Sequence, residues 1–468
     1  MRLSHKRRRS WRQTKSLYQT SVLLAVGCIL IGFFTLVRPF HTFNLWLSDQ
    51  LFLSERPSPN IVVVGIDDDT LETYGKWSSW PRSLHAQAVH NLSSSGARVI
   101  GFDVLFSDSS SDDDMLAEAM RSAGSIVLPL VGTQQQPSTD PRTTYAQILL
   151  PVSPLQQASA HTGHANMTPD PDGRVRRLPL AIRDPDGQAY PAFGLAVLSV
   201  LFGTPLPQEY VRQEGVLRLL ARTMPVDAAY SFRINFAPDY KSRPYISYKN
   251  VIRGDFAPST VENKIVLIGM TATGELDKWA VPTSSSRVPG VFIQATVIDN
   301  ILRQQFLTDV GAGVDLAIML LLVGITGFAL PRVGPRKGGL LSGALFAGYL
   351  VATFIMFEDG YILNLLYPLS TLPVVYVSSI VTQNVTTTIE NARLHRRVAD
   401  GYKDTIRALA ASIDAKDPYT RGHSQRVTEY AILGAISLSM SQEDLEILEY
   451  AGILHDIGKI GIPDSILR

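Results

Sequence analysis

The stretch Ala451-Gly-Ile-Leu-His455-Asp456-Ile-Gly458-Lys459-Ile-Gly461-Ile-Pro463 places three titratable side chains inside an apolar run. Such groups lose hydration when they are buried, so they need partners or a metal to compensate. On a helix, His455 and Lys459 are four residues apart and Asp456 and Lys459 are three apart, so the three side chains can converge. Imidazole and carboxylate suit a divalent metal that activates water near neutral pH, and an ammonium suits a phosphate oxygen. The stretch therefore predicts metal-assisted hydrolysis of a phosphoester.

A second motif lies upstream and strengthens this prediction. The run Asp417-Pro-Tyr-Thr420-Arg-Gly-His423-Ser-Gln-Arg426-Val supplies another histidine and, three residues later, an arginine on the same helical face. A lone His-Asp pair is more often a buried histidine satisfied by its neighbour, but two motifs together favour a site. The span of residues 409–467 resembles the HD-GYP branch of the HD phosphohydrolases.

The resemblance implies an all-α cytoplasmic domain that hydrolyses cyclic di-GMP. It makes His423, His455 and Asp456 ligands of a divalent metal, iron or manganese, and it places Lys459 at the substrate phosphate as a catalytic residue. The family continues with further helices that carry more metal ligands, whereas this sequence ends at Arg468. We therefore expect residues 403–468 to be the N-terminal part of the domain, incomplete and without hydrolysis in this chain.

The composition indicates membrane segments. Charged residues make up 18% of the chain and hydrophobic residues 45%, and about 25% charged is usual for soluble domains. The formal net charge is +1, so the overall charge does not favour a nucleic-acid partner. Cys28 is the single cysteine, which excludes a disulfide within the chain.

Four apolar runs predict crossings of a lipid bilayer, each close to the ~20 residues that a spanning helix needs. A basic tail precedes the first run and predicts a cytoplasmic N-terminus, and the absence of a small-residue cleavage site favours an uncleaved anchor. The alternative, buried helices of a large soluble domain, is disfavoured by three such runs in close succession. We expect a multi-pass inner-membrane protein with both termini in the cytoplasm. The segments are the tail 1–16 and the spans 17–38, 311–330, 340–357 and 361–382.

Residues 40–308 then lie outside the membrane, and they alternate between strand and helix patterns. Alternation of this kind predicts an α/β domain whose sheet is covered on both faces. The strand candidates are Ile61–Ile66, Arg98–Phe106, Ser125–Val131 and Lys264–Gly269, and the helix candidates are Leu84–Ser95, Asp113–Ser122, Ala192–Leu201 and Val291–Gln304.

Short motifs in this segment resemble the second class of CHASE extracytoplasmic sensor domains. The resemblance covers nearly all of residues 45–305 and implies an α/β sensor. Because the ligands of that family are generally not established, it implies only an unknown extracytoplasmic ligand. The motifs are Trp80-Pro81-Arg82, Gly101–Phe106, Gly163-His164-Ala-Asn166, Pro169–Arg177 and Pro289–Ala295.

Three aspartates are candidate sensor-ligand residues. Asp67, Asp69 and Asp103 fall near the carboxyl ends of two strand candidates that we expect to be neighbours, and open α/β sheets bind ligands at such edges. The alternative, which we favour, is that Asp69 or Thr70 caps the next helix and Asp103 holds a loop. The arginines after the Asp-Gly turn can bind an anion, but a solvated strand face is the more frequent outcome; they are Arg174, Arg176 and Arg177.

Residues 383–402 lack proline and have a helical stripe of apolar residues, so they predict a helical connector. The stripe is too short to decide whether two copies form a homodimeric coiled coil. The primary hypothesis is a multi-domain membrane protein: an α/β extracytoplasmic sensor domain, four transmembrane helices and an all-α HD-type domain. The alternative is a non-catalytic membrane sensor with an idle output domain. An enzyme active in the external domain has no motif to support it.

Overall fold

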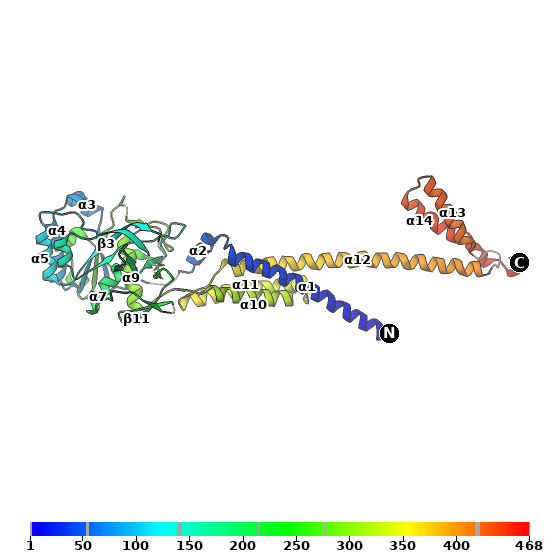
Figure 1. Ribbon diagram of the computed structural model, residues 1–468, viewed down its shortest axis with the longest axis horizontal. Coiled ribbons are helices and arrows are strands. Elements are labelled where there is room, and N and C mark those ends of the chain that lie inside the picture. The colour runs from blue at the N-terminus through cyan, green and yellow to red at the C-terminus, as the bar shows by residue number, and fades with distance from the viewer. Residues whose placement is uncertain are drawn as a thin grey trace. The chain divides into compact units, whose positions relative to one another are not determined.

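The computed structural model describes residues 2–52, 56–137, 143–213, 215–275, 277–416 and 422–467 (Figure 1). The first part of the upstream motif, residues 417–421, lies outside the described residues. The chain forms two compact units, Leu23–Tyr376 and a second unit made of Met1–Val22 with Val377–Arg468. Each unit is described by itself.

A nine-stranded sheet forms the centre of the first unit. Its core is a parallel run in the order β13-β1-β14-β2-β3, and β5 pairs with β3 in parallel. From β3 the sheet continues through β4 and β7 to β8, at the edge opposite β13. The strands are β1 (Ile61–Ile66), β2 (Val99–Asp103), β3 (Ile126–Gln136), β4 (Thr144–Leu149), β5 (His161–His164), β7 (Ala181–Arg183), β8 (Ala189–Pro191), β13 (Tyr245–Ser247) and β14 (Ile265–Met270).

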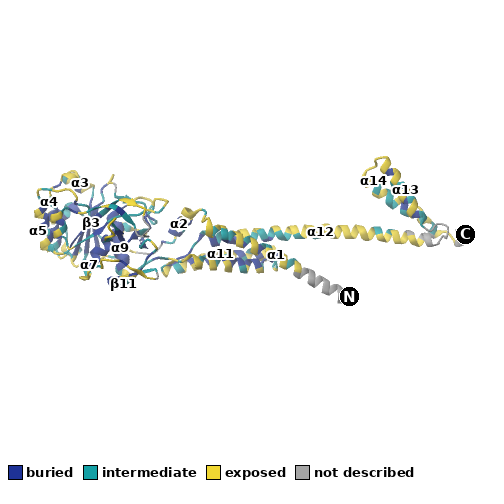
Figure 2. Ribbon diagram, viewed as in Figure 1, coloured by how far each residue is buried: buried dark blue, intermediate teal, exposed yellow. Residues whose placement is uncertain are grey.

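Helices cover both faces of the sheet, as the sequence predicts. Strand β1 shows how this arises: Ile61 and Val63 pack with α7 (Phe193–Phe202) and α9 (Gly290–Arg303), while Val62, Val64 and Ile66 pack with the helices of the other face. Those helices are α4 (Arg82–Ser94), α5 (Asp113–Ala123) and α8 (Tyr248–Arg253). Figure 2 shows the strands as buried. The α/β prediction is therefore confirmed.

One detail of the sequence prediction is wrong: β1 and β2 are not neighbours. Strand β14 lies between them, with Gly65 beside Gly269 and Gly269 beside Asp103. Smaller elements complete the unit, and they are α2 (His41–Asp49), α3 (Asp68–Tyr74), α6 (Ser153–Ala158), β6 (Arg177–Pro179), β9 (Arg212–Gln213), β10 (Val216–Leu219), β11 (Arg222–Pro225), β12 (Ser231–Arg233), β15 (Lys278–Trp279), β16 (Val288–Pro289), β17 (Thr308–Asp309) and β18 (Tyr361–Ile362).

Three helices of the described residues are long and apolar enough to cross a membrane: Thr14–Leu36 within α1 (Arg2–Leu36), α10 (Ala312–Ala329) and α11 (Pro335–Glu358). The fourth expected span lies at the start of α12 (Leu366–Lys416), and α12 is not one of the three. The helices pack closely, since a Cβ at Gly27 or Gly327 would overlap a side chain of the neighbouring helix. The predicted helical connector lies within α12.

A buried arginine joins the sensor to the segment that follows α1. The side chain of Arg176 is 1% exposed, and its Nε and Nη2 donate to the two carboxylate oxygens of Asp49 at 2.8 and 2.7 Å. Asp170 and Asp172 accept from the same guanidinium, at 2.9 Å from Nη1 and 2.7 Å from Nη2. The solvated strand face that the sequence favours is therefore wrong for Arg176.

The next residue, Arg177, joins the sensor to the segment before α10. Its Nη2 donates to Asp309 at 2.7 Å and its Nη1 donates to Asp227 at 3.0 Å. Arg233 Nη1 donates to the second carboxylate oxygen of Asp309 at 2.6 Å. Asp309 ends β17, and α10 begins at Ala312. Arg176 thus holds Asp49, which follows α1, and Arg177 holds Asp309, which precedes α10.

Two buried histidines should make the sensor sensitive to acid. His85 Nδ1 lies 2.7 Å from the Tyr248 hydroxyl inside an aromatic cluster, and His164 is fully buried. Burial lowers the pKa of each histidine from 6.5 to about 3, and the charge of Arg82 adds to this effect at His85.

Lowering the pH from 7 to 5 should destabilise the sensor. The unfolded chain binds protons at these histidines below about pH 6.5, whereas the folded chain does not until near pH 3, so stability falls through this window. The expected loss at pH 5 is about 2 kcal/mol for each histidine. The midpoint of thermal unfolding, followed by near-ultraviolet circular dichroism in detergent micelles, measures it. His85→Gln should weaken the pH dependence and the exposed-site control His90→Gln should keep it; equal behaviour of the two variants contradicts the account.

Candidate metal centre

The C-terminal residues form a hairpin of two helices, α13 (His423–Ser437) and α14 (Gln442–Leu454). Gly422 precedes α13 with a φ of 70°, a left-handed conformation that glycine adopts without strain. Ser441 caps α14, because its hydroxyl accepts from the backbone N–H of Asp444. These local signals fix where α13 starts, at His423, and where α14 starts.

A glycine brings the two helices of the hairpin together. A Cβ at Gly452 would lie 2.6 Å from Thr428 Oγ1 and 3.1 Å from Thr428 Cα, so only glycine permits this approach. Both residues are buried, and Thr428 Oγ1 donates to the Ser424 carbonyl at 2.7 Å. The contact sets the distance between the start of α13 and the end of α14, where the candidate ligands lie.

The hairpin brings together the three residues that the sequence predicts as metal ligands. Nitrogen atoms of His423 and His455 and an oxygen of Asp456 all lie within 4.8 Å of one another. The two imidazole rings are 5.4 Å apart between centroids and tilted by 59°. Two imidazoles and one carboxylate suit a divalent transition metal, so the chemistry of the donor set fits such an ion.

Hydrogen bonds orient two of these groups. His455 Nδ1 lies 2.8 Å from the Gly452 carbonyl, which can only accept, so Nδ1 carries the proton and Nε2 keeps its lone pair. Lys459 Nζ donates to Asp456 Oδ2 at 2.7 Å, as the three-residue spacing predicts. The continuous helix through Lys459 is wrong, however. α14 ends at Leu454, and a 3-10 turn, Ile457–Gly461, places Lys459 beside Asp456. A short helix, α15 (Asp464–Leu467), follows.

The pKa of Asp456 is lowered from its ordinary value of 3.8. The hydrogen bond from Lys459 is the largest cause. Burial is the next largest and acts in the opposite direction, and the charges of His455, Lys459 and His423 lower the pKa further. The carboxylate is therefore ionised at neutral pH, which is the state that a cation binds. The lowered pKa also means that any stability from this group is present above pH 4 and is lost as the pH falls through the folded value.

The end of α12 is tied to the hairpin through a glutamate that the sequence analysis missed. Glu449 on α14 accepts from Arg407 at 3.0 Å and from Lys403 at 3.5 Å, both on α12. Glu449 lies on α14, and His455 directly follows the last residue of that helix. A movement of α12 would therefore act on α14 and on the candidate ligand that follows it. No local sequence motif marks the contact of Glu449 with Lys403 and Arg407.

In the sensor, two of the three candidate aspartates have structural partners. Asp67 caps α3, since it accepts from the backbone N–H of Thr70 at 3.0 Å, and it also accepts from the hydroxyls of Ser247 and Tyr245. Asp69 is exposed and pairs with Lys249 at 2.5 Å. A residue of this loop does cap the next helix, but it is Asp67, so the prediction that Asp69 or Thr70 is the cap is wrong.

Asp103 has a different environment. Burial and the nearby charge of Asp277 raise its pKa well above 3.8, and burial also raises the pKa of Asp277. The Asp277 carboxylate lies against Gly290, where α9 begins, and accepts from Trp279 Nε1 at 2.8 Å. A ligand role for Asp103 remains a prediction.

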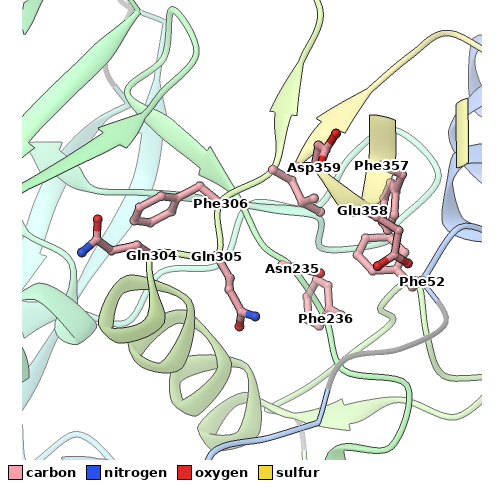
Figure 3. A pocket seen from close by; sticks show the side chains of 11 residues that line it. Phe52, Asn235, Phe236, Gln304, Gln305, Phe306, Phe357, Glu358 and Asp359 are labelled. Carbon is pink, nitrogen blue, oxygen red and sulfur yellow. The ribbon is translucent and has the colours of Figure 1, made fainter. Parts of the chain in front are cut away.

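Cavities occur where the sensor meets the apolar helices. One, of about 190 Å³, has an aromatic wall of Phe52, Phe236, Phe306 and Phe357 (Figure 3). Phe52 packs edge-on against Phe357 at the end of α11, with ring centroids 5.2 Å apart. A second cavity, of about 410 Å³, lies between Arg177 and the sensor-side ends of α1, α10 and α12. These cavities come from contacts between distant segments, so no sequence pattern marks them.

Comparison with known families agrees with this architecture. The CHASE2 domain family matches residues 22–329, more than half of the 468-residue chain. The chain belongs to the CHASE2 family. The match includes the nine-stranded sheet of the sensor, and it confirms the resemblance that the Trp80-Pro81-Arg82 and Pro289–Ala295 motifs indicate.

The HD domain family matches residues 420–468 of this CHASE2 protein. The 3'3'-cGAMP-specific phosphodiesterase 3 of Vibrio cholerae serotype O1 is 44% identical over 77 residues, which cover 16% of this chain and 17% of the relative. The cyclic di-GMP phosphodiesterase response regulator RpfG of Xanthomonas campestris pv. campestris is 40% identical over 70 residues, 15% of this chain and 18% of the relative. The matches thus span less than a fifth of these curated relatives. No solved structure matches the chain.

These matches confirm the predicted HD domain. A CHASE2 sensor is joined in one chain to an HD domain whose relatives are cyclic dinucleotide phosphodiesterases. Helices long enough to cross a bilayer make it a membrane protein.

Replacing Gly452 by alanine should loosen the hairpin. The added methyl group overlaps Thr428, so we expect α13 and α14 to separate and the hairpin to lose about 1–3 kcal/mol. Hydrogen exchange of the α13 and α14 amides, read by mass spectrometry, measures this loss. Gly434→Ala is the matched control, because Gly434 on α13 has open space around it, and there alanine should slow exchange by a helix-propensity gain of about 0.5–1 kcal/mol. Faster exchange in both variants, or in neither, contradicts the close approach.

Proposed function

We propose that this CHASE2 protein is a transmembrane signalling protein whose external sensor controls an HD-type, metal-dependent cyclic dinucleotide phosphodiesterase module. The observation that carries the proposal is the convergence of His423, His455 and Asp456, with Lys459 bound to Asp456. The relatives support the substrate class, since their names assign them to 3'3'-cGAMP and cyclic di-GMP. We propose cyclic di-GMP as the first substrate to test.

In this proposal each residue of the centre has one role. His423, through a ring nitrogen, His455, through Nε2, and Asp456 hold one divalent cation, manganese or iron. The ion, when bound, supplies a Lewis acid for phosphoester chemistry. Lys459 neutralises charge on the substrate phosphate, and its bond to Asp456 keeps that carboxylate ionised. The hydrogen bond from His455 to the Gly452 carbonyl holds the imidazole in the tautomer that binds metal.

The proposed topology has four crossings of the inner membrane. A cytoplasmic location is supported by the positive charge of the N-terminal tail and of the segment Arg332–Lys337, which runs from the turn after α10 into the first turn of α11. Residues 361–382, most of which form the start of α12, serve as the fourth span. Residues 40–308 are then extracytoplasmic and residues 383–468 are cytoplasmic.

We propose that ion pairs carry the signal from the sensor to the helices. Asp49, held by Arg176, follows α1, and Asp309, held by Arg177 and Arg233, precedes α10. A change of the sensor that moves these arginines must move the helix ends or leave buried charges unpaired, which is costly. At the other end, Glu449 links α12 to α14, and His455 directly follows α14.

A homodimer is the partner state that we propose for α12. The helix is mostly exposed beyond its membrane part (Figure 2), and large apolar side chains recur along it. Burying such a stripe against the same stripe of a second copy is the usual solution for a long helix with an apolar seam. Val381, Val385 and Tyr402 fall at a and d positions of one heptad register and form this stripe.

Manganese binding tests the centre. The purified full chain in detergent micelles should bind about one Mn²⁺ per chain, measured as loss of the electron paramagnetic resonance signal of free Mn²⁺. His455→Asn should weaken binding at least tenfold, because it removes one ligand. The matched control is His395→Asn on the exposed part of α12, which should bind as the wild type does. Equal binding by both variants contradicts the proposed centre.

Binding of cyclic di-GMP tests the substrate class in the same samples. Calorimetric titration should show binding that needs Mn²⁺ and that Lys459→Met weakens about tenfold, since a charge-assisted bond to phosphate is lost. Arg396→Met, an exposed cation of α12, is the control and should not change the affinity. Equal affinity of the wild type and Lys459→Met, or no binding of cyclic di-GMP in the presence of Mn²⁺, favours the alternative of a non-catalytic membrane sensor.

A further inference from the structure

The cavity of about 410 Å³ at the seam between the sensor and the apolar helices has the size of a small-molecule site. All of its lining belongs to the Leu23–Tyr376 unit. Its ionisable lining is mixed and nearly balanced in charge, with three guanidinium groups, one imidazole and three carboxylates. Arg177 and Arg233 already pair with Asp227 and Asp309, so the lining atoms without partners decide which ligand fits.

Donors without partners line one part of the cavity. Arg233 is 5% exposed, and within the described part of the chain its Nε and Nη2 have no hydrogen-bond partner. The Nε of Arg177 is in the same state. Asp309 does not satisfy them, because its Oδ1 accepts from Arg233 Nη1 and its Oδ2 from Arg177 Nη2, which are different nitrogens of the two guanidinium groups. Buried guanidinium donors without an acceptor are costly, and an oxyanion is the group that satisfies them best.

An acceptor without a partner lines another part. Asp315 lies in the first turn of α10. Asn364 hydrogen-bonds its carboxylate, but among the described residues its Oδ1 has no hydrogen-bond partner. The carboxylate is half-buried, and it faces a cavity that also holds Arg38 and His41. An ammonium group supplies the donors that this oxygen lacks.

We propose that this cavity binds a zwitterionic phosphate ester of the phosphoethanolamine type. The phosphate lies at Arg177 and Arg233, and the ammonium group lies at Asp315. The orphaned donors and the orphaned acceptor line one cavity, so a single ligand satisfies both. The proposal adds a ligand and a site to the sensor role proposed above, and it does not depend on hydrolysis in the HD domain.

The site would act on the link between the sensor and α10. A phosphate at the unpartnered donors of Arg233 and Arg177 shares these guanidinium groups with Asp309, and the two anions repel each other. Occupancy thus weakens the ion pairs that hold the residue just before α10. The ligand changes how firmly the sensor holds this helix.

The same chemistry has two sources, a phospholipid headgroup or a water-soluble ester. Large exposed apolar side chains lie on the chain beside Arg38, among them Leu36, Val37 and Phe40. Acyl chains can cover these residues while the headgroup enters the cavity. The test must therefore compare probes with and without acyl chains.

The test measures the thermal unfolding midpoint of the purified full chain in detergent micelles during titration. The probes are dihexanoyl phosphatidylethanolamine, dihexanoyl phosphatidylglycerol and glycerophosphoethanolamine. We expect a saturable rise with the phosphatidylethanolamine and a weaker effect of the phosphatidylglycerol, which lacks the ammonium group. Saturation by glycerophosphoethanolamine at similar concentration supports the site and assigns the ligand to solution rather than to the bilayer.

Variants assign the binding to the cavity. Arg233→Lys keeps a charge beside Asp309 but removes donors, so it should weaken binding at least tenfold. Asp315→Asn should remove the preference for the ammonium-bearing lipid. Arg218→Lys, at an exposed position of β10, is the matched control and should bind as the wild type does. Should Arg233→Lys fail to fold, the more exposed Arg177→Lys replaces it. Unchanged affinity and unchanged lipid preference in these variants overturn the proposal.

Discussion

The buried guanidinium of Arg176 is the interaction on which the arrangement of the sensor and its helices depends. It satisfies Asp49, Asp170 and Asp172 at once, and Arg176 and Asp49 are 127 positions apart in sequence. Breaking such a pair leaves a buried charge and costs about 3–5 kcal/mol, more than most single contacts. The segment after α1 is therefore fixed to the turn of the sensor that carries both of the other aspartates.

Ion pairs also fix the segment that leads into α10. Arg177 and Arg233 hold Asp309, and the chain continues from there into α10. Upstream of Asp309 lie α9, which covers one face of the sheet, and β14, which lies between β1 and β2. Because β14 lies in the middle of the parallel run, the chain leads from the centre of the sheet through α9 to Asp309. The link from the sensor to α10 is thus built from packed and charged groups without a long flexible segment.

Local patterns were sufficient to predict the elements, and they failed for long-range pairings. The apolar run Ile61–Ile66 predicts a buried strand because alternate residues must be covered on both faces, but nothing in it shows that β14 becomes its neighbour. Arg176 follows a turn, where arginine side chains are usually solvated. It is buried because it pairs with Asp49, which is distant in the sequence. In the HD region the motifs predicted His423, His455 and Asp456, which the hairpin brings together, but not the end of α14 before His455 or the contact of Gly452 with Thr428.

A double-mutant cycle on Asp49 and Arg176 tests the central claim most directly. The single variants Asp49→Leu and Arg176→Met and the double variant are unfolded with urea in detergent micelles, and the near-ultraviolet signal of the sensor reports unfolding. The account predicts that the double variant is more stable than the sum of the single losses allows, with a coupling of about 2–3 kcal/mol. Additive losses, with no coupling between the two residues, would contradict it.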